Sequence, residues 1–224
     1  MTDPTRLRAP RRDATENRAA LLAAARTVLK RDPEGSLDEI AREAGLSRRA
    51  LYGHFASREA LVLELIEQGI ARITARLADV SHPEPLVRLA LIAARLWAEV
   101  RDVRVMAEFA VRGPHQRLVG ARLAPLRSRV RAAVAEGVAD GTVRDDIPVN
   151  TLARLLEGAA LTVLDEAARR ELDAATGHRL VVLSVLSLAG LDAAGAHRLV
   201  ERVPELGRVA EPATDGTAQD GAAE

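Results

Sequence analysis

The stretch SLDEIAREAGLSRRALYGHF, from Ser36 to Phe55, decides the fold of the N-terminal part of this 224-residue chain. Counted from Leu37, it has a small residue in fifth place, Ala41, and a glycine in ninth place, Gly45. An apolar residue, Leu51, stands fifteenth. Two helices that cross steeply need a small residue where their backbones meet, a turn residue that tolerates positive φ, and an apolar anchor in the second helix. The spacing therefore predicts a helix-turn-helix.

The same stretch indicates where its two helices begin and what the second one exposes. Ser36 and Ser47 precede them, and each can offer a side-chain oxygen to the free amides of a first helical turn. Arginine can donate two hydrogen bonds to guanine, and tyrosine and imidazole can hold phosphates, which suits the major groove of DNA. A solvated helical corner is the alternative interpretation. The polar side chains left outside the predicted core are Arg48, Arg49, Tyr52 and His54.

Composition narrows the class of protein. The chain is 48% hydrophobic, enough for a sizeable core, and it has no cysteine, which excludes disulfides and thiolate metal sites. Its formal net charge is +0. Residues 1–56 nevertheless hold 11 basic against 8 acidic side chains, while the remainder holds 21 against 24. The small positive excess lies in the part that contains the predicted helix-turn-helix.

Nothing in the hydropathy indicates secretion or membrane insertion. The first 30 residues lack the apolar core of a signal peptide. The most apolar run, Leu180 to Leu191, is shorter than the ~18 to 20 residues that a membrane-spanning helix needs. We therefore expect a cytoplasmic protein with no membrane partner.

The pattern along the chain is helical almost throughout. Ala, Leu, Arg and Glu dominate, and no stretch alternates with period two, so we predict an all-α fold. Residues 1–13 have two prolines and four arginines and predict a disordered basic arm, and residues 207–224 predict a disordered tail. Between them we expect a three-helix helix-turn-helix domain over 14–57 and a helical domain for effector binding and dimerisation over 58–206.

Breakers and apolar periodicity predict the individual helices. Pro125 should kink or split the helix that contains it. We expect a break at Thr176-Gly177 as well. The predicted helices cover 14–30, two short segments within 37–54, 58–80, 86–101, 103–112, 116–140, 149–172 and 178–203.

Three predicted helices followed by LSRRALYGHFASREALVLELI resemble the DNA-binding domain of the TetR family of bacterial transcriptional repressors, over about residues 14–65. The resemblance implies that Tyr52, His54 and Arg58 hold phosphates and that Ser36 does the same. Arg58 stands where the family usually has lysine, which keeps the charge but changes the geometry. The implied function is a dimeric repressor that binds palindromic operator DNA and is released by a small organic effector.

The helices that begin near Val149 and His178 are apolar nearly all round, so each should be buried on two sides. One side can face its own domain and the other a second copy, and the resemblance implies such a four-helix bundle in a homodimer. Central helices of a monomer are the alternative. The interface residues assigned on this basis are Leu152, Leu156, Val163, Val182 and Leu186.

Bulky side chains are scarce, which makes their positions informative. Trp97, Met106 and Phe109 fall in adjacent predicted helices and could line an effector pocket. His115 could orient a polar ligand. Plain core packing for the first three, and a helix start or surface position for the histidine, are the alternatives.

The sequence offers little for catalysis. Its histidines, at 54, 82, 115, 178 and 197, lack the i, i+4 pairing of a zinc helix, and no Gly-rich phosphate loop or nucleophile elbow is present. We expect no enzyme activity, cofactor or metal. A ligand-independent nucleoid-type DNA-binding protein is the alternative function, and a helical-bundle enzyme comes third.

Overall fold

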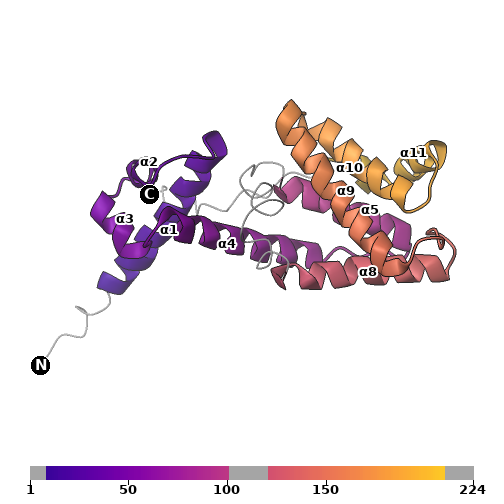
Figure 1. Ribbon diagram of the computed structural model, residues 1–224, viewed down its shortest axis with the longest axis horizontal. Helices are drawn as coiled ribbons and strands as arrows, with labels where there is room; N and C mark the ends of the chain where they lie inside the picture. Colours follow the sequence, from indigo (N-terminus) through magenta and orange to yellow (C-terminus); the bar gives the residue numbers. More distant parts are fainter. Residues whose placement is uncertain (1–8, 101–120, 210–224) are drawn as a thin grey trace, which may run out of the picture. The chain divides into compact units, whose positions relative to one another are not determined.

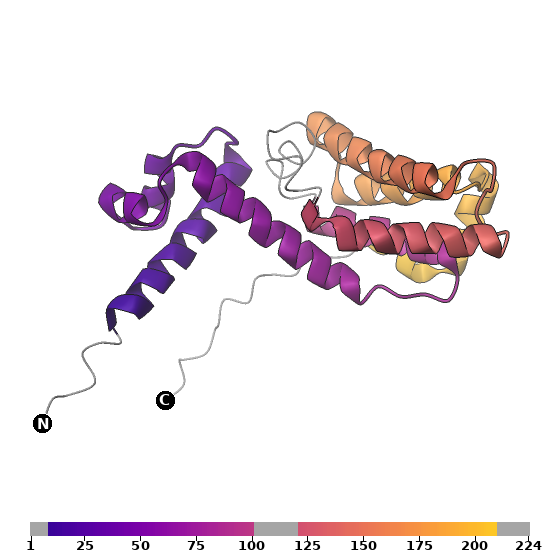
Figure 2. The same cartoon turned by 60° about the horizontal axis from the view of Figure 1, so that its bottom comes forward.

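The computed structural model describes residues 9–100 and 121–209 (Figures 1 and 2). Within these ranges every regular element is a helix and no strand occurs, as predicted. The chain forms two compact units, and one of the boundaries between them falls inside helix α8, Ala124–Ala139. Of the described residues, 9–80 and 121–132 belong to the first unit, and 81–100 and 133–209 belong to the second.

The first unit begins with the three helices predicted for a helix-turn-helix domain. Its apolar core takes side chains from α1, α2, α3 and α4, including the fully buried Leu21, Ile40, Leu51 and Leu61. Figure 1 shows α2 and α3 as a short pair beside α1. The helices of this unit are α1 (Ala9–Arg31), α2 (Leu37–Glu43), α3 (Arg48–His54), α4 (Arg58–Ala78) and the first part of α8.

The turn between α2 and α3 has the predicted geometry. Gly45 has a φ of 67°, and a Cβ there would meet nothing within 4 Å, so the backbone angle and not crowding favours glycine. The amide of Leu46 donates to the carbonyl of Ala41 (2.9 Å), which closes the end of α2. Ala41 and Leu51 are buried where the two helices meet. The helix-turn-helix prediction is confirmed at each of its diagnostic positions.

Helix α1 starts earlier than expected. It begins at Ala9 instead of Ala14, so residues 9–13 of the predicted arm are helical. Pro10 then lies in the first turn, where a missing backbone N–H costs nothing and a fixed φ favours the helix. Residues 1–8 of the predicted arm lie outside the described part of the chain.

The second unit is a helical bundle in which α10 packs against α5, α9 and α11 (Figure 1). Val181, Val182, Val185 and Leu186 of α10 are all buried in it. The helices are α5 (Pro85–Val100), the second part of α8, α9 (Val149–Arg170), α10 (Ala174–Leu188), α11 (Ala193–Arg202) and α12 (Pro204–Gly207).

The helix predicted over 178–203 is wrong in its length, because the segment is divided between α10 and α11. Gly190 adopts a φ of 118° at the break, and the carbonyl of Ala189 accepts a hydrogen bond from the amide of Arg144 (2.9 Å). Asp192 then caps α11 by accepting from the amide of Gly195 (2.6 Å). The amides of Gly190 and Leu191 donate to the carbonyls of Ser187 and Leu186 (both 3.1 Å), so a glycine C-cap ends α10.

The break predicted at Thr176-Gly177 is also wrong. Asp173 caps α10 by accepting hydrogen bonds from the amides of Ala175 and Thr176 (both 2.9 Å). The helix begins at Ala174, so Thr176 and Gly177 lie inside it. Hydrogen bonds from Thr176 hold the pKa of Asp173 below its usual value. The aspartate cap therefore outweighs the glycine as a local signal.

The break predicted near Pro125 is confirmed. A turn at Leu123 precedes α8, and Pro125 lies in the first turn of that helix. The predicted helix over 103–112, residues 116–120 and most of the predicted tail lie outside the described residues. Gly207, where the tail was expected to start, is instead the last residue of α12.

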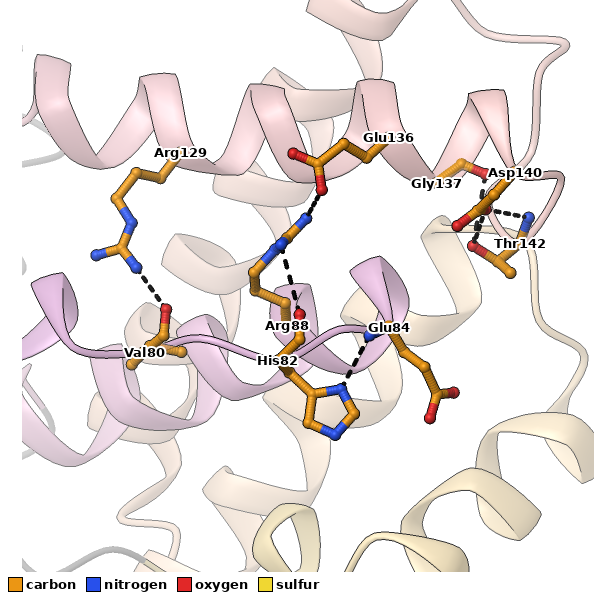
Figure 3. A network of polar contacts seen from close by, with 9 residues as sticks. All are labelled: Val80, His82, Glu84, Arg88, Arg129, Glu136, Gly137, Asp140 and Thr142. Atoms are coloured by element: carbon orange, nitrogen blue, oxygen red, sulfur yellow. Dashed lines mark hydrogen bonds and ion pairs between the residues drawn. The ribbon is translucent and has the colours of Figure 1, made fainter.

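Arginines satisfy carbonyls that helix ends leave free. In the first unit, Arg129 of α8 donates to the carbonyls of Leu77 and Val80 at the C-terminal end of α4, and Figure 3 shows the contact with Val80. In the second unit, Arg88 donates to the carbonyl of His82 (3.4 Å) and pairs with Glu136 (Figure 3). These contacts fix the ends of α4 and the start of α5, each within its own unit.

Candidate nucleic-acid interface

Helix α3 has one buried face and one exposed polar face. Leu51 is fully buried and anchors the helix, while Tyr52 is 45% exposed. Ser47 precedes the helix, and its hydroxyl oxygen accepts a hydrogen bond from the amide of Ala50 (3.1 Å). Arg48 and Arg49 are exposed and His54 is half-buried. The sequence prediction of the exposed set thus agrees with the structure, although His54 is less accessible than the others.

Arg18 of α1 holds the C-terminal end of α3 in place. Its Nη1 donates to the carbonyl of His54 (3.0 Å), and its guanidinium carbon lies 4.4 Å from the centre of the Phe55 ring. The same guanidinium pairs with Glu64 of α4. Sequence reasoning missed this residue, because nothing in the pattern distinguishes an inward arginine on α1 from the outward ones.

Arg48 is held between two neighbours on the exposed face. Its Nη1 lies 3.1 Å from Oδ2 of Asp38 on α2, and its guanidinium carbon lies 5.6 Å from the centre of the Tyr52 ring. A hydrogen bond with the Tyr52 side chain and the negative charge of Asp38 raise the pKa of Arg48 above its usual value. Arg48 is therefore cationic and oriented before any partner binds.

Ser36 makes a capping box with Glu39. Its amide (2.7 Å) and its hydroxyl (2.9 Å) both donate to Oε2 of Glu39, and its oxygen accepts from the Glu39 amide (3.2 Å). These hydrogen bonds hold the pKa of Glu39 below its usual value. The phosphate contact implied for Ser36 would therefore require Glu39 to give way.

Arg58 turns toward the protein and not toward solvent. Its Nε donates to the carbonyl of Gly35 (3.1 Å) and its Nη2 to the carbonyl of Pro33 (2.5 Å). One planar guanidinium thus spans two carbonyls of the turn between α1 and α2, which a lysine ammonium cannot match. This contact does not fit the free phosphate ligand that the resemblance implied, and it gives a physical reason for arginine at this position.

We expect Arg58→Lys to lower the free energy of unfolding by about 1 to 2 kcal/mol, because at least one charge-assisted hydrogen bond is lost. Urea denaturation monitored by circular dichroism measures this free energy. Arg122→Lys is the matched control, since Arg122 makes an exposed ion pair with Glu67 (3.2 Å) in the same unit. Unchanged stability of Arg58→Lys would show that the hydrogen bonds of Arg58 to the turn between α1 and α2 do not stabilise the protein.

Trp97 occupies the core of the second unit. The side chain is 2% exposed, and its Nε1 donates to the carbonyl of Ala174 (3.2 Å). Its ring lies against Gly177 of α10. The core-packing alternative therefore describes Trp97 in this structure. The other predicted pocket residues, Met106, Phe109 and His115, lie outside the described residues.

Most of the predicted dimer-interface residues are buried within the single chain. Leu152, Leu156, Val182 and Leu186 are at most 3% exposed, and Val163 is half-buried. A side chain already covered by its own chain offers no area to a partner, so these four assignments are corrected to core positions. Two large apolar side chains on the same helices remain uncovered, Leu155 (44% exposed) and Leu180 (41%).

The described histidines show no grouping for metal chemistry. His178 is buried, and its Nε2 lies 2.7 Å from the carbonyl oxygen of Leu206. His197 contacts the carbonyl of Ala193 through Nδ1 (2.7 Å). Within residues 9–100 and 121–209, no three histidine or acidic side chains are placed to hold a metal ion. No helix in these ranges is long and apolar enough to cross a membrane.

The described residues thus form an all-helical fold with a buried helix-turn-helix core and an outward basic face on the second helix of that motif. Residues 21–65 match the family described as bacterial regulatory proteins, tetR family. The similarity to that family covers the helix-turn-helix segment and the start of α4.

The proteins similar to the chain include two curated relatives and one solved structure. The HTH-type transcriptional regulator EthR of Mycolicibacterium smegmatis is 39% identical over 31% of this chain and 33% of its own length. An uncharacterized HTH-type transcriptional regulator of Mycobacterium tuberculosis is 35% identical over 55% of this chain and 61% of its own length. The chain thus spans less than two thirds of either relative.

The fold similarity extends further than the sequence similarity. The transcriptional regulator FadR from Bacillus subtilis, solved in complex with stearoyl-CoA, superposes with a TM-score of 0.62. The match covers 77% of this chain and 97% of the other at 17% identity. This likeness establishes a common fold for most of the chain.

Proposed function

We propose that this protein is a transcriptional repressor that binds palindromic operator DNA through α3. The observation that carries the proposal is the outward face of this helix, where Arg48, Arg49 and Tyr52 are exposed while Leu51 anchors the opposite face. A helix anchored in this way can enter the major groove and present its first turn to base edges. The match of residues 21–65 to the tetR family supports the same function.

The side chains of this face divide into two roles. Arg48 and Arg49 have the donor geometry for two hydrogen bonds to a guanine and are the proposed base readers. Ser47 and Tyr52 each have one hydroxyl and His54 has an imidazole, and these three are the proposed phosphate contacts. Base contacts discriminate between sequences, whereas phosphate contacts strengthen binding to every sequence about equally.

Alanine at Arg48 or Arg49 should cost about 1 to 3 kcal/mol of binding free energy on the preferred duplex and little on a scrambled one, because a guanine contact is lost. Tyr52→Phe and His54→Ala should weaken the binding of the protein to both duplexes about equally. The duplex is one that the wild-type protein selects from a randomised pool, and fluorescence anisotropy gives each affinity. Equal losses on both duplexes for both arginine variants would remove them from base readout.

We further propose that the protein is a homodimer and that a small organic effector bound among the helices of the second unit releases it from DNA. A palindromic operator presents the same half-site twice, which a two-fold dimer matches. The structure of FadR with stearoyl-CoA supports ligand binding in a regulator of this fold. Operator binding places the protein in the cytoplasm, with the DNA.

A further inference from the structure

We propose that Asp38 is a specificity-determining residue that acts by positioning Arg48. The inference rests on the proposed function, in which Arg48 reads a base. It concerns a carboxylate on α2, outside the recognition helix, to which neither the resemblance nor the sequence pattern gave a role. The consequence is that part of the sequence preference of α3 is set by a residue that need not touch a base.

The geometry places Asp38 directly beside the reading arginine. Asp38 lies in the first turn of α2 and Arg48 is the first residue of α3. Oδ2 of Asp38 is 3.1 Å from Nη1 of Arg48, and the Tyr52 ring, one helical turn further along α3, flanks the guanidinium at 5.6 Å. The guanidinium therefore has a charge partner from one helix and an aromatic partner from the other.

Stability does not account for this pair. The Asp38 side chain is 48% exposed and that of Arg48 is 67% exposed, and ion pairs between exposed groups contribute little to folding. An arginine side chain, however, loses much rotamer freedom when it docks on a guanine. A carboxylate that already restricts the side chain in the free protein reduces this loss at the moment of binding.

The same carboxylate disfavours the wrong contacts. On a duplex that offers no suitable guanine, a free Arg48 would turn to the nearest phosphate, because phosphates attract arginine whatever the sequence. Asp38 competes for the guanidinium and repels the phosphate, so such contacts are weakened. Both effects raise the ratio of affinities for the preferred and the scrambled duplex.

Asp38→Asn tests the inference, because it keeps the shape of the side chain and removes the charge. On the scrambled duplex we expect affinity to rise about three- to tenfold, and the dependence of log K on log salt to steepen by about one as Arg48 gains a phosphate. On the duplex selected by the wild-type protein, affinity should rise less or fall. If the affinity for the selected duplex stays about the same, the ratio of the two affinities drops about three- to tenfold.

The double variant Asp38→Asn with Arg48→Ala distinguishes an effect of Asp38 on the position of Arg48 from a direct effect of its charge on DNA binding. If Asp38 acts through Arg48, its replacement changes the ratio in the wild-type background and leaves it unchanged in the Arg48→Ala background. Asp79→Asn is the matched control, since Asp79 is an exposed aspartate at the C-terminal end of α4 in the same unit. It should leave the ratio as in the wild type.

Two results would overturn the inference. Asp38→Asn could change the affinities for both duplexes by the same factor. It could also lower the ratio of the two affinities by as much in the Arg48→Ala background as in the wild-type background. In either case a wild-type protein that still prefers its selected duplex leaves the proposed function standing. A wild-type protein without any preference overturns both. Circular dichroism checks that the variant folds, and Asp38→Ser, which keeps a polar side chain without charge, should reproduce the drop.

Discussion

Gly177→Ala is expected to lower the free energy of unfolding by about 1 to 3 kcal/mol, because the new methyl group has no room. A Cβ at this position would lie 2.0 Å from Cζ2 and 2.1 Å from Cη2 of Trp97. The indole is rigid, almost fully buried and tied by Nε1 to the carbonyl of Ala174, so it cannot move aside cheaply. The normal helix preference for alanine over glycine should therefore be reversed here.

Urea denaturation measures this effect, and the fluorescence of Trp97, the single tryptophan of the chain, reports on the site itself. Gly53→Ala is the control, since Gly53 lies in α3 and a Cβ there would meet nothing within 4 Å. It should be neutral or should stabilise the protein by up to about 1 kcal/mol, as circular dichroism would show. A Gly177→Ala variant at least as stable as the wild type would refute the close packing of α5 on α10.

Leu155→Glu and Leu180→Glu are expected to convert the proposed dimer into a monomer and to abolish binding to the selected duplex. Both leucines are large, apolar and more than two fifths exposed on α9 and α10. In a two-fold interface each substitution appears twice, so each places two unpaired carboxylates in an apolar contact. Loss of the dimer also removes the simultaneous contact with two half-sites.

Size-exclusion chromatography with light scattering gives the oligomeric state of each variant. Ala194→Glu is the matched control, because it adds the same carboxylate at an exposed position on α11, near the N-terminal end where acidic side chains are tolerated. It should remain dimeric. A wild-type monomer at micromolar concentration, or dimers in both leucine variants, would exclude this face as the interface.

The helix-turn-helix could be predicted from sequence because each of its positions admits few residue types. Gly45 needs positive φ, Ala41 needs to be small, and Leu51 needs to be apolar and buried. The end of α10 was predicted wrongly because the apolar run from Leu180 to Leu191 continues past it. The local signals of a helix end are nevertheless present, since Gly190 has a positive φ and Asp192 caps the next helix.

The exposed side chains of the candidate interface could be predicted from the sequence, whereas the arginines that hold its helices in place could not. Periodicity separates Leu51 from Arg48 and Arg49, because one face of α3 must be buried. It does not distinguish Arg18 and Arg58, which turn inward, since the direction of a long side chain depends on which carbonyls lie within its reach.

The same limit applied to the proposed dimer face. Where a helix is apolar on nearly every side, periodicity cannot separate the face covered by its own chain from the face left open. Leu156 is buried within the protomer and its neighbour Leu155 is exposed, and only the packing of α9 against the other helices decides which is which.

The central claim is that this protein reads DNA sequence, and one titration tests it most directly. The wild-type protein is used to select duplexes from a randomised pool, and its affinity for a selected duplex is then compared with that for a scrambled version at physiological salt. We predict a palindromic selected sequence and binding at least about a thousandfold tighter than to the scrambled duplex. Equal affinities for the two duplexes, or a pool that shows no enrichment, would contradict the account.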